Sequence, residues 1–168
     1  MNERKIEELK KEMCSENGVI MVSGGCSSGK TSLVNHCLLD ILGNDKAFYF
    51  APDLTEVGCF CELLNYSCKL GKNHTSLEDA CDYINTYVNI LSNKMCINML
   101  YNYIDDVFCI SEYKYLIVDN INMLSHGDGL DGIKTLLLNM SRRYSLTIVA
   151  LQSTFGKDIC IKRLAKDK

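Results

Sequence analysis

The residues best suited to chemistry form a glycine-rich segment at positions 24–31 that fits the pattern G-x-x-x-x-G-K-[ST]. The segment consists of Gly24, Gly25, Cys26, Ser27, Ser28, Gly29, Lys30 and Thr31. In such a loop, backbone N–H groups surround phosphate oxygens, the lysine reaches the β- and γ-phosphates, and the final hydroxyl binds Mg²⁺. The sequence therefore predicts a site for ATP and Mg²⁺, with residues 24–31 around the phosphates and Thr31 beside the metal.

A second candidate is Asp119, which ends the apolar run of residues 115–118. In proteins with a phosphate loop, an aspartate at the end of a strand helps to hold Mg²⁺. An aspartate that only caps the following turn would give the same local pattern. Because the phosphate loop precedes it in the same chain, we interpret Asp119 as a second metal residue.

Two carboxylates follow the next apolar run, residues 46–50. Either Asp53 or Glu56 could polarise the water that attacks the γ-phosphate, as a general base or as an orienting acceptor. The alternative is structural, because Asp53 or Thr55 could cap the helix that is expected to follow. The sequence leaves both interpretations open.

Gln152 follows a further apolar run, residues 146–151. An amide at the end of a strand could contact the γ-phosphate or the attacking water and so sense hydrolysis. A polar loop residue without a function would produce the same pattern. We treat Gln152 as a candidate sensor.

Apolar runs alternate with helical patterns along the chain. Strands are expected at residues 18–23, 46–50, 115–119 and 146–151, and helices at 2–14, 31–39, 55–70, 75–91, 102–110 and 130–144. The alternation predicts an α/β fold with three layers, α/β/α, around a mainly parallel sheet. We expect a single domain over 1–168, with an N-terminal helix over 1–16, a core over 17–155 and a basic tail over 156–168. Ligands of such sheets bind at the carboxyl ends of the strands, where the candidate residues fall.

Bulk composition sets broad limits. The chain has 168 residues and a net charge of −3, which suits one globular domain and gives no overall attraction to nucleic acid. No apolar run is long enough to cross a membrane, and the charged start does not resemble a secretory signal. The ten cysteines are expected mainly as core thiols rather than disulfides or metal ligands, and we expect a cytoplasmic protein.

Four motifs together resemble a known family. They are residues 24–31, Phe50-Ala51-Pro52-Asp53-Leu54-Thr55, Leu116-Ile117-Val118-Asp119-Asn120-Ile121 and Ile148-Val149-Ala150-Leu151-Gln152. Their order and spacing resemble the RecA-like ATPase core and, within it, the ATPase domain of DnaB-type replicative helicases. The resemblance spans roughly residues 18–155, and residues 133–144 resemble the helix that precedes the family's last motif.

The resemblance implies ATP hydrolysis coupled to single-stranded DNA, self-association or a replication protein. It places the family's catalytic glutamate on Asp53, which is one methylene shorter, and places residues 126–129 where RecA-type proteins hold a DNA-contacting loop. The family's collar domain and arginine-finger strands have no counterpart, so we expect a minimal relative. Two alternatives remain: a nucleotide-binding assembly module with little hydrolysis, and a small-molecule or nucleoside kinase. A kinase usually has an arginine-bearing lid, and no arginine occurs between residues 52 and 115.

Overall fold

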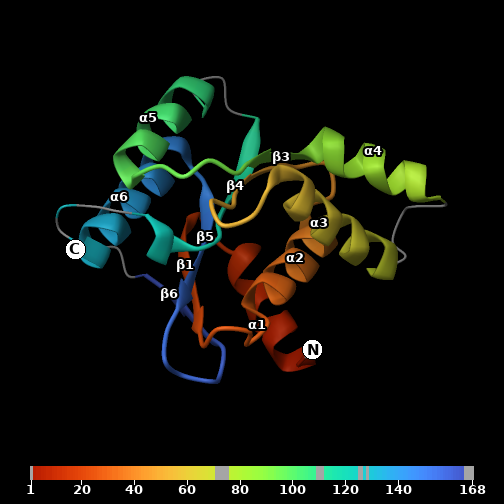
Figure 1. Ribbon diagram of the computed structural model, residues 1–168, viewed down its shortest axis with the longest axis horizontal. Coiled ribbons are helices and arrows are strands. Elements are labelled where there is room, and N and C mark those ends of the chain that lie inside the picture. The colour runs from red at the N-terminus through yellow and green to blue at the C-terminus, as the bar shows by residue number, and fades with distance from the viewer. Residues whose placement is uncertain (1, 71–75, 109–111, 125–126, 128, 165–168) are drawn as a thin grey trace.

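A six-stranded sheet forms the centre of the computed structural model, which describes residues 2–70, 76–108, 112–124, 127 and 129–164 (Figure 1). The strands are β1 (Gly18–Gly24), β2 (Lys46–Phe50), β3 (Val88–Leu91), β4 (Tyr113–Val118), β5 (Thr147–Ser153) and β6 (Cys160–Arg163). Their order across the sheet is β3-β2-β4-β5-β1-β6. The first five strands in this order pair in parallel, and β6 runs antiparallel to β1.

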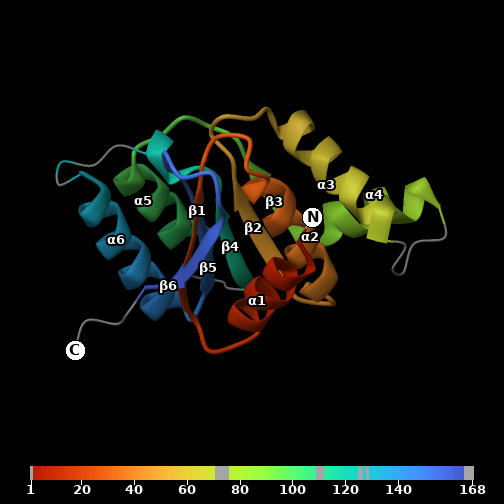
Figure 2. The same ribbon diagram turned by 90° about the horizontal axis from the view of Figure 1, so that it is seen from below.

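Helices cover both faces of the sheet. They are α1 (Glu3–Met13), α2 (Lys30–Ile41), α3 (Glu56–Leu70), α4 (Leu77–Tyr87), α5 (Ile97–Phe108) and α6 (Gly129–Tyr144), with a short 3-10 helix η1 (Ile121–Met123) after β4. Figure 2 shows α5 and α6 on one side of the sheet and α1 and α2 on the other. The prediction of a three-layer α/β/α fold with a mainly parallel sheet is therefore confirmed.

Each buried strand contributes to both layers of the core. In β1, Ile20 and Val22 pack in the layer of α1 to α4, whereas Val19 and Met21 pack in the layer of α5 and α6. Successive side chains of a strand point to opposite faces, so a strand that is covered on both faces must be apolar throughout. This explains why β1, β4 and β5 are visible in the sequence as continuous apolar runs.

Two strands differ from the sequence expectations. The helix expected over residues 75–91 ends at Tyr87, and Val88–Leu91 forms β3 at the edge of the sheet beside β2. The segment expected as a basic tail contains β6, which pairs Ile20 with Arg163 and Ser23 with Cys160. Both are edge strands that depend on a distant partner strand, and local periodicity carries no information about such a partner.

Arg163 fastens β6 to the end of α1. Its Nε donates to the Glu12 carboxylate at 2.8 Å, and its Nη1 donates to the carbonyl oxygen of Glu16 at 2.9 Å. Arg163 and Lys162 are late cations that the sequence does not place at a subunit interface. In the structure, the Arg163 guanidinium is used inside the domain.

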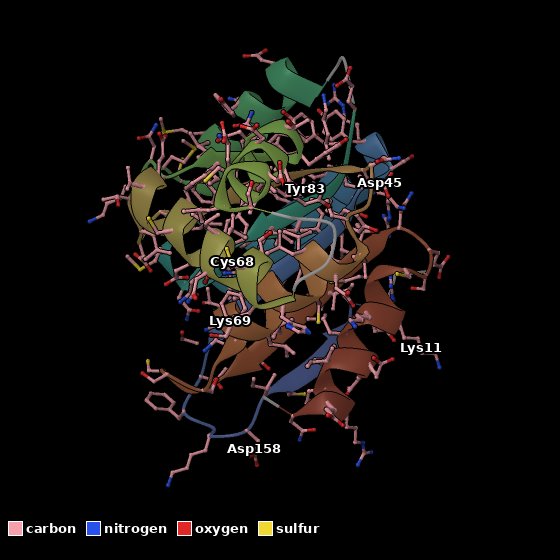
Figure 3. All side chains as sticks on the ribbon, turned by 90° about the vertical axis from the view of Figure 1, so that its right-hand side faces the viewer. Lys11, Asp45, Cys68, Lys69, Tyr83 and Asp158 are labelled. Atoms are coloured by element: carbon pink, nitrogen blue, oxygen red, sulfur yellow. The ribbon has the colours of Figure 1, made fainter. Side chains whose placement is uncertain are left out.

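At the β3 edge of the sheet, α4 packs against β3 and β2. Tyr83 on α4 donates its hydroxyl to the carbonyl oxygen of Gly43 at 3.1 Å, close to Asp45 in the loop before β2 (Figure 3). None of the helices in the described ranges has the length and apolar character needed to cross a bilayer.

Candidate functional site

The segment of residues 24–31 joins the end of β1 to the start of α2. Gly29 adopts a positive φ of 87°, which glycine enters without a steric penalty, and this turn directs the chain into α2. The first helical hydrogen bond runs from the Leu33 N–H to the carbonyl oxygen of Gly29 at 2.9 Å. The N–H groups of Lys30, Thr31 and Ser32 therefore precede the helical ladder and are available to an anion at the positive end of the helix dipole.

Lys30 lies within this loop and is only 8% exposed. Its Nζ donates to the carbonyl oxygens of Gly24 at 3.1 Å and Gly25 at 2.8 Å. Two neutral carbonyls compensate a buried ammonium less well than an anion does, because hydrogen bonds between ionised partners are stronger. The geometry therefore suits Lys30 to exchange these carbonyls for phosphate oxygens.

The hydroxyl of Ser28 is a further sign that the loop is built for a ligand. Its Oγ is buried and has no hydrogen-bond partner among the described residues. Buried polar atoms are nearly always paired in folded proteins. A phosphate oxygen in the loop would supply the missing partner.

The loop between β5 and β6 covers the start of the phosphate loop. The Thr154 N–H donates to the carbonyl oxygen of Gly24 at 2.9 Å. A pocket of about 470 Å³ lies between residues 25–28 and residues 154–157, and it includes the fully exposed side chain of Phe155. The loop bearing Asp158 projects from the body of the domain (Figure 3).

Gly25 leaves no room for a side chain under this cover. A Cβ at this position would lie 2.6 Å from the carbonyl oxygen of Gly156, closer than atoms approach without displacement. We expect Gly25→Ala to lower the free energy of unfolding by about 1–3 kcal/mol, the usual effect of overpacking. Urea denaturation measures this change. Gly127→Ala is the control, because a Cβ there meets nothing within 4 Å; equal stability of the two variants would contradict the prediction.

Thr31 and Asp119 meet although they are far apart in the sequence. Thr31 Oγ1 donates to Asp119 Oδ2 at 2.8 Å, which joins the first turn of α2 to the end of β4. Mg²⁺ prefers oxygen ligands and commonly binds through one or two carboxylates together with substrate phosphates. Among the described residues, no group of three or more His, Cys, Asp or Glu side chains could hold a metal. The Thr31–Asp119 pair offers two oxygen atoms of the kind that Mg²⁺ prefers.

Two further polar side chains lie beside Asp119. The Tyr49 hydroxyl is 2.9 Å from Asn35 Oδ1 and 3.4 Å from Asp119 Oδ2. Both Tyr49 and Asn35 are buried. Neither residue stands out in the sequence, because a tyrosine within an apolar strand looks like an ordinary core residue.

Burial raises the pKa of the Asp119 carboxyl above its ordinary value of 3.8. Hydrogen bonds from Thr31 and Tyr49 and the charge of Lys30 oppose this rise, whereas the charge of Asp53 adds to it. A carboxyl whose pKa is raised by folding destabilises the fold once it ionises, so the unliganded domain loses stability as pH rises through the folded-state pKa. A cation beside Asp119 would remove that penalty.

The structure separates the two candidate catalytic carboxylates. The Thr55 hydroxyl accepts from the Gly58 N–H at 3.0 Å and so caps α3, which leaves Asp53 without the capping role that the sequence allowed. Asp53 is exposed in the turn after β2, and its charge acts on Asp119. Glu56 begins α3 and lines a groove of about 590 Å³ along β3 instead. The catalytic role of either carboxylate stays a prediction.

A third carboxylate, Glu62, lies within the electrostatic reach of Asp119. Partial burial, followed by the charge of Asp119, raises the pKa of Glu62. Glu62 is one helical turn from Cys59, which is 1% exposed and packs in the core. Glu62 itself is exposed, and its spacing from Cys59 is the local signal that it lies near the buried side of α3.

Gln152 lies half-buried near the end of β5, opposite Ser23 of β1. Strand alternation places it on the same face as Ile148 and Ala150, which pack in the layer of α5 and α6. The Thr31–Asp119 pair lies on the other face. Gln152 therefore lies near the carboxyl end of β5, as expected, and its contact with a phosphate stays a prediction.

The last residue of β5 is fastened to the turn after β4. Asn122 Oδ1 accepts from the Ser153 N–H at 2.8 Å, and Asn122 Nδ2 donates to the Ser153 carbonyl oxygen at 3.2 Å. Asn120 Nδ2 also donates to Ser153 Oγ at 3.0 Å. These amides fix the end of β5 relative to the end of β4, a role that no local pattern in the sequence indicates.

The cysteines in the described residues differ in exposure, and Cys81 and Cys96 are intermediate. Cys37 and Cys59 are buried, as expected of core thiols, whereas Cys14, Cys26, Cys61, Cys68 and Cys160 are exposed. The expectation of mainly core thiols is therefore wrong for these five. Cys14 directly follows α1, Cys61 and Cys68 lie on α3, Cys26 lies in the phosphate loop and Cys160 lies on the edge strand β6.

Burial raises the pKa of Cys37 and of Cys59 to about 12. Since the thiolate is the reactive form, we expect iodoacetamide at mildly alkaline pH to modify Cys26 and Cys68 while Cys37 and Cys59 stay unmodified. Peptide mass spectrometry before and after unfolding in urea measures this difference. Modification of Cys59 in the native protein at the rate of Cys68 would contradict the burial described here.

Solved structures that share this architecture include the following two. The first is an ATPase domain of the DnaB helicase family, with a TM-score of 0.64 and 15% identity, over 85% of this chain and 61% of that chain. The second is a DnaB-like replicative helicase, described with its interactions with primase, with a TM-score of 0.66 and 13% identity, over 84% of this chain and 41% of that chain.

This chain has the fold of a DnaB-type helicase ATPase domain. The resemblance inferred from the four motifs is confirmed at the level of the fold. This RecA-like domain spans less than two thirds of either similar chain. No protein-family model matches the sequence, and no curated protein matches it.

Proposed function

We propose that this RecA-like domain binds ATP with Mg²⁺ and hydrolyses it, and that hydrolysis is coupled to single-stranded DNA, to self-association or to a replication protein. The observation that carries the proposal is the 2.8 Å contact between Thr31 and Asp119 at the end of a phosphate loop with unpaired N–H groups. Local sequence could place the loop before a helix, but only the fold brings a carboxylate to the last residue of the motif.

In this proposal, the chain's own residues bind and orient. The N–H groups of the loop and the Lys30 ammonium hold the phosphates, and Ser28 donates its free hydroxyl to them. Thr31 and Asp119 hold Mg²⁺, which when bound neutralises charge on the phosphates. Asp53 accepts the proton of the attacking water or orients it, and Gln152 reports the state of the γ-phosphate.

The direct test is calorimetry with a non-hydrolysable ATP analogue, with and without Mg²⁺, followed by measurement of ATP turnover. We expect binding that Mg²⁺ strengthens, and turnover that single-stranded DNA increases. Size-exclusion chromatography in the same buffers reports self-association. Absence of binding under both conditions would remove the proposal as a whole.

A second candidate is a nucleotide-binding assembly module with little hydrolysis. It is favoured by Arg163, because the late arginine that could complete a neighbouring site is fastened to Glu12 and Glu16 within its own domain. Binding without turnover, with assembly that depends on the nucleotide, would select this candidate. Turnover accelerated by DNA would exclude it.

A further inference from the structure

Four polar side chains from three elements meet at the buried end of the site. Thr31 and Asn35 are one turn apart on α2 and therefore share a face of that helix. Tyr49 on β2 pairs with Ile117 on β4, and Asp119 follows two residues later, so Tyr49 and Asp119 lie on the same face of the sheet. Hydrogen bonds join this face of α2 to the sheet, from Thr31 to Asp119 and from Tyr49 to Asn35.

We propose that Tyr49 is a positioning residue that holds the Asp119 carboxylate for Mg²⁺, with its own hydroxyl oxygen held by Asn35. The inference rests on the proposed function, since it concerns the same metal. Tyr49 is 0% exposed, so it acts on the metal through Asp119 and not by touching the nucleotide.

The hydrogen-bonding capacity of the cluster supports this role. A tyrosine hydroxyl has one proton to donate, and both Asn35 Oδ1 and Asp119 Oδ2 are within reach of it. As oriented, the Asn35 amide leaves its buried Nδ2 without a partner among the described residues. Turning the amide over lets Nδ2 donate to the Tyr49 oxygen and frees the hydroxyl proton for Asp119. A buried carbonyl oxygen then takes the unpaired position, which proteins tolerate better than an unpaired N–H.

The two hydrogen bonds to Asp119 end on the same oxygen. Thr31 Oγ1 and the Tyr49 hydroxyl both approach Oδ2, so Oδ1 takes part in neither contact and would be the oxygen available to Mg²⁺ or to a water bound to it. A carboxylate held at one oxygen from two directions keeps its plane fixed. Loss of a residue that hydrogen-bonds a metal ligand typically weakens metal binding by about 10- to 100-fold.

Tyr49→Phe removes the hydroxyl and keeps the ring. The measured quantity is the ratio of the dissociation constants of a non-hydrolysable ATP analogue without and with Mg²⁺, which isolates the contribution of the metal. We expect the substitution to lower this ratio at least about tenfold and to leave metal-free binding unchanged. Urea denaturation of the same samples shows whether the variant is folded.

Tyr115→Phe is the matched control. Tyr115 is 1% exposed, lies in the same core layer on the neighbouring strand, and has its hydroxyl beside Lys114, away from Asp119. We expect this variant to keep the wild-type ratio. If Mg²⁺ strengthens analogue binding by the wild-type protein and Tyr49→Phe has the same ratio, the role of Tyr49 alone is overturned. A wild-type protein without any effect of Mg²⁺ would overturn the metal site and this inference together.

A second measurement covers the case in which Tyr49→Phe fails to fold. 3-Fluorotyrosine placed at position 49 or 115 keeps each hydroxyl, and the fluorine resonance reports its surroundings. We expect Mg²⁺ added to the analogue-bound protein to shift the resonance at position 49 and not at position 115. A resonance at position 49 that ignores Mg²⁺ would overturn the proposal.

Discussion

Lys30→Ala is expected to weaken the binding of ATP with Mg²⁺ by about 100-fold. Hydrogen bonds to charged groups contribute roughly 1.5–3 kcal/mol each, and the lysine would make them with two phosphates. About 1.4 kcal/mol corresponds to a tenfold change in affinity, so the loss of one or two such contacts gives this magnitude. Calorimetry with the non-hydrolysable analogue measures the change.

The control for this substitution is Lys157→Ala, which removes the same charge from the pocket beside the loop. Lys157 is exposed, and exposed charges usually contribute about 0–1 kcal/mol. Urea denaturation of Lys30→Ala shows whether the variant stays folded without the hydrogen bonds from the ammonium to the carbonyl oxygens of Gly24 and Gly25. Equal affinities of the two variants would show that the phosphate loop does not bind the triphosphate.

Asp53→Asn is expected to reduce ATP turnover by about 100-fold or more while nucleotide binding is retained. A positioned general base typically contributes about 10²- to 10⁴-fold in rate, and an amide cannot accept the proton. Binding should stay equal or improve slightly, since one negative charge near Asp119 is removed. Single-turnover phosphate release, with the dissociation constant measured in parallel, separates the two effects.

Two matched carboxylates test whether this role belongs to Asp53. Glu56→Gln changes a residue of the β3 groove and should leave turnover unchanged. Glu62→Gln changes a residue whose pKa the charge of Asp119 raises. If Glu62 acts only through its charge, turnover should change by less than about tenfold. If turnover is lost in Glu62→Gln and kept in Asp53→Asn, the catalytic assignment moves to α3.

The parts of the site that were predictable are those that depend on local sequence. The phosphate loop follows a fixed spacing, and Asp119 ends a short, continuous apolar run that favours a buried strand. By contrast, the position of Tyr49 beside Asp119 depends on the register of β2 with β4, which pairs residues far apart in the chain. Local periodicity contains no such information, so the tyrosine looked like part of the core.

The same limit explains the errors at the edges of the sheet. Val88–Leu91 continues the apolar spacing of α4, and only pairing with β2 makes it a strand. In β6, Ile161 is the single aliphatic residue among polar neighbours, and pairing with β1 stabilises the strand. The sequence allows either Thr55 or Asp53 to cap α3. The hydrogen bond from the Gly58 N–H to Thr55 Oγ1 shows that Thr55 is the cap.

The Asn122 side chain bonds both the N–H and the carbonyl oxygen of Ser153, as the backbone of a neighbouring strand would. It prolongs the ladder between β4 and β5 past the point where the two backbones part. Sliding of one strand along the other would break both bonds at once, so these two strand ends form a stiff frame under the nucleotide site. We expect any displacement caused by a bound phosphate to be larger in residues 155–159 than at Ser153, whose backbone Asn122 holds.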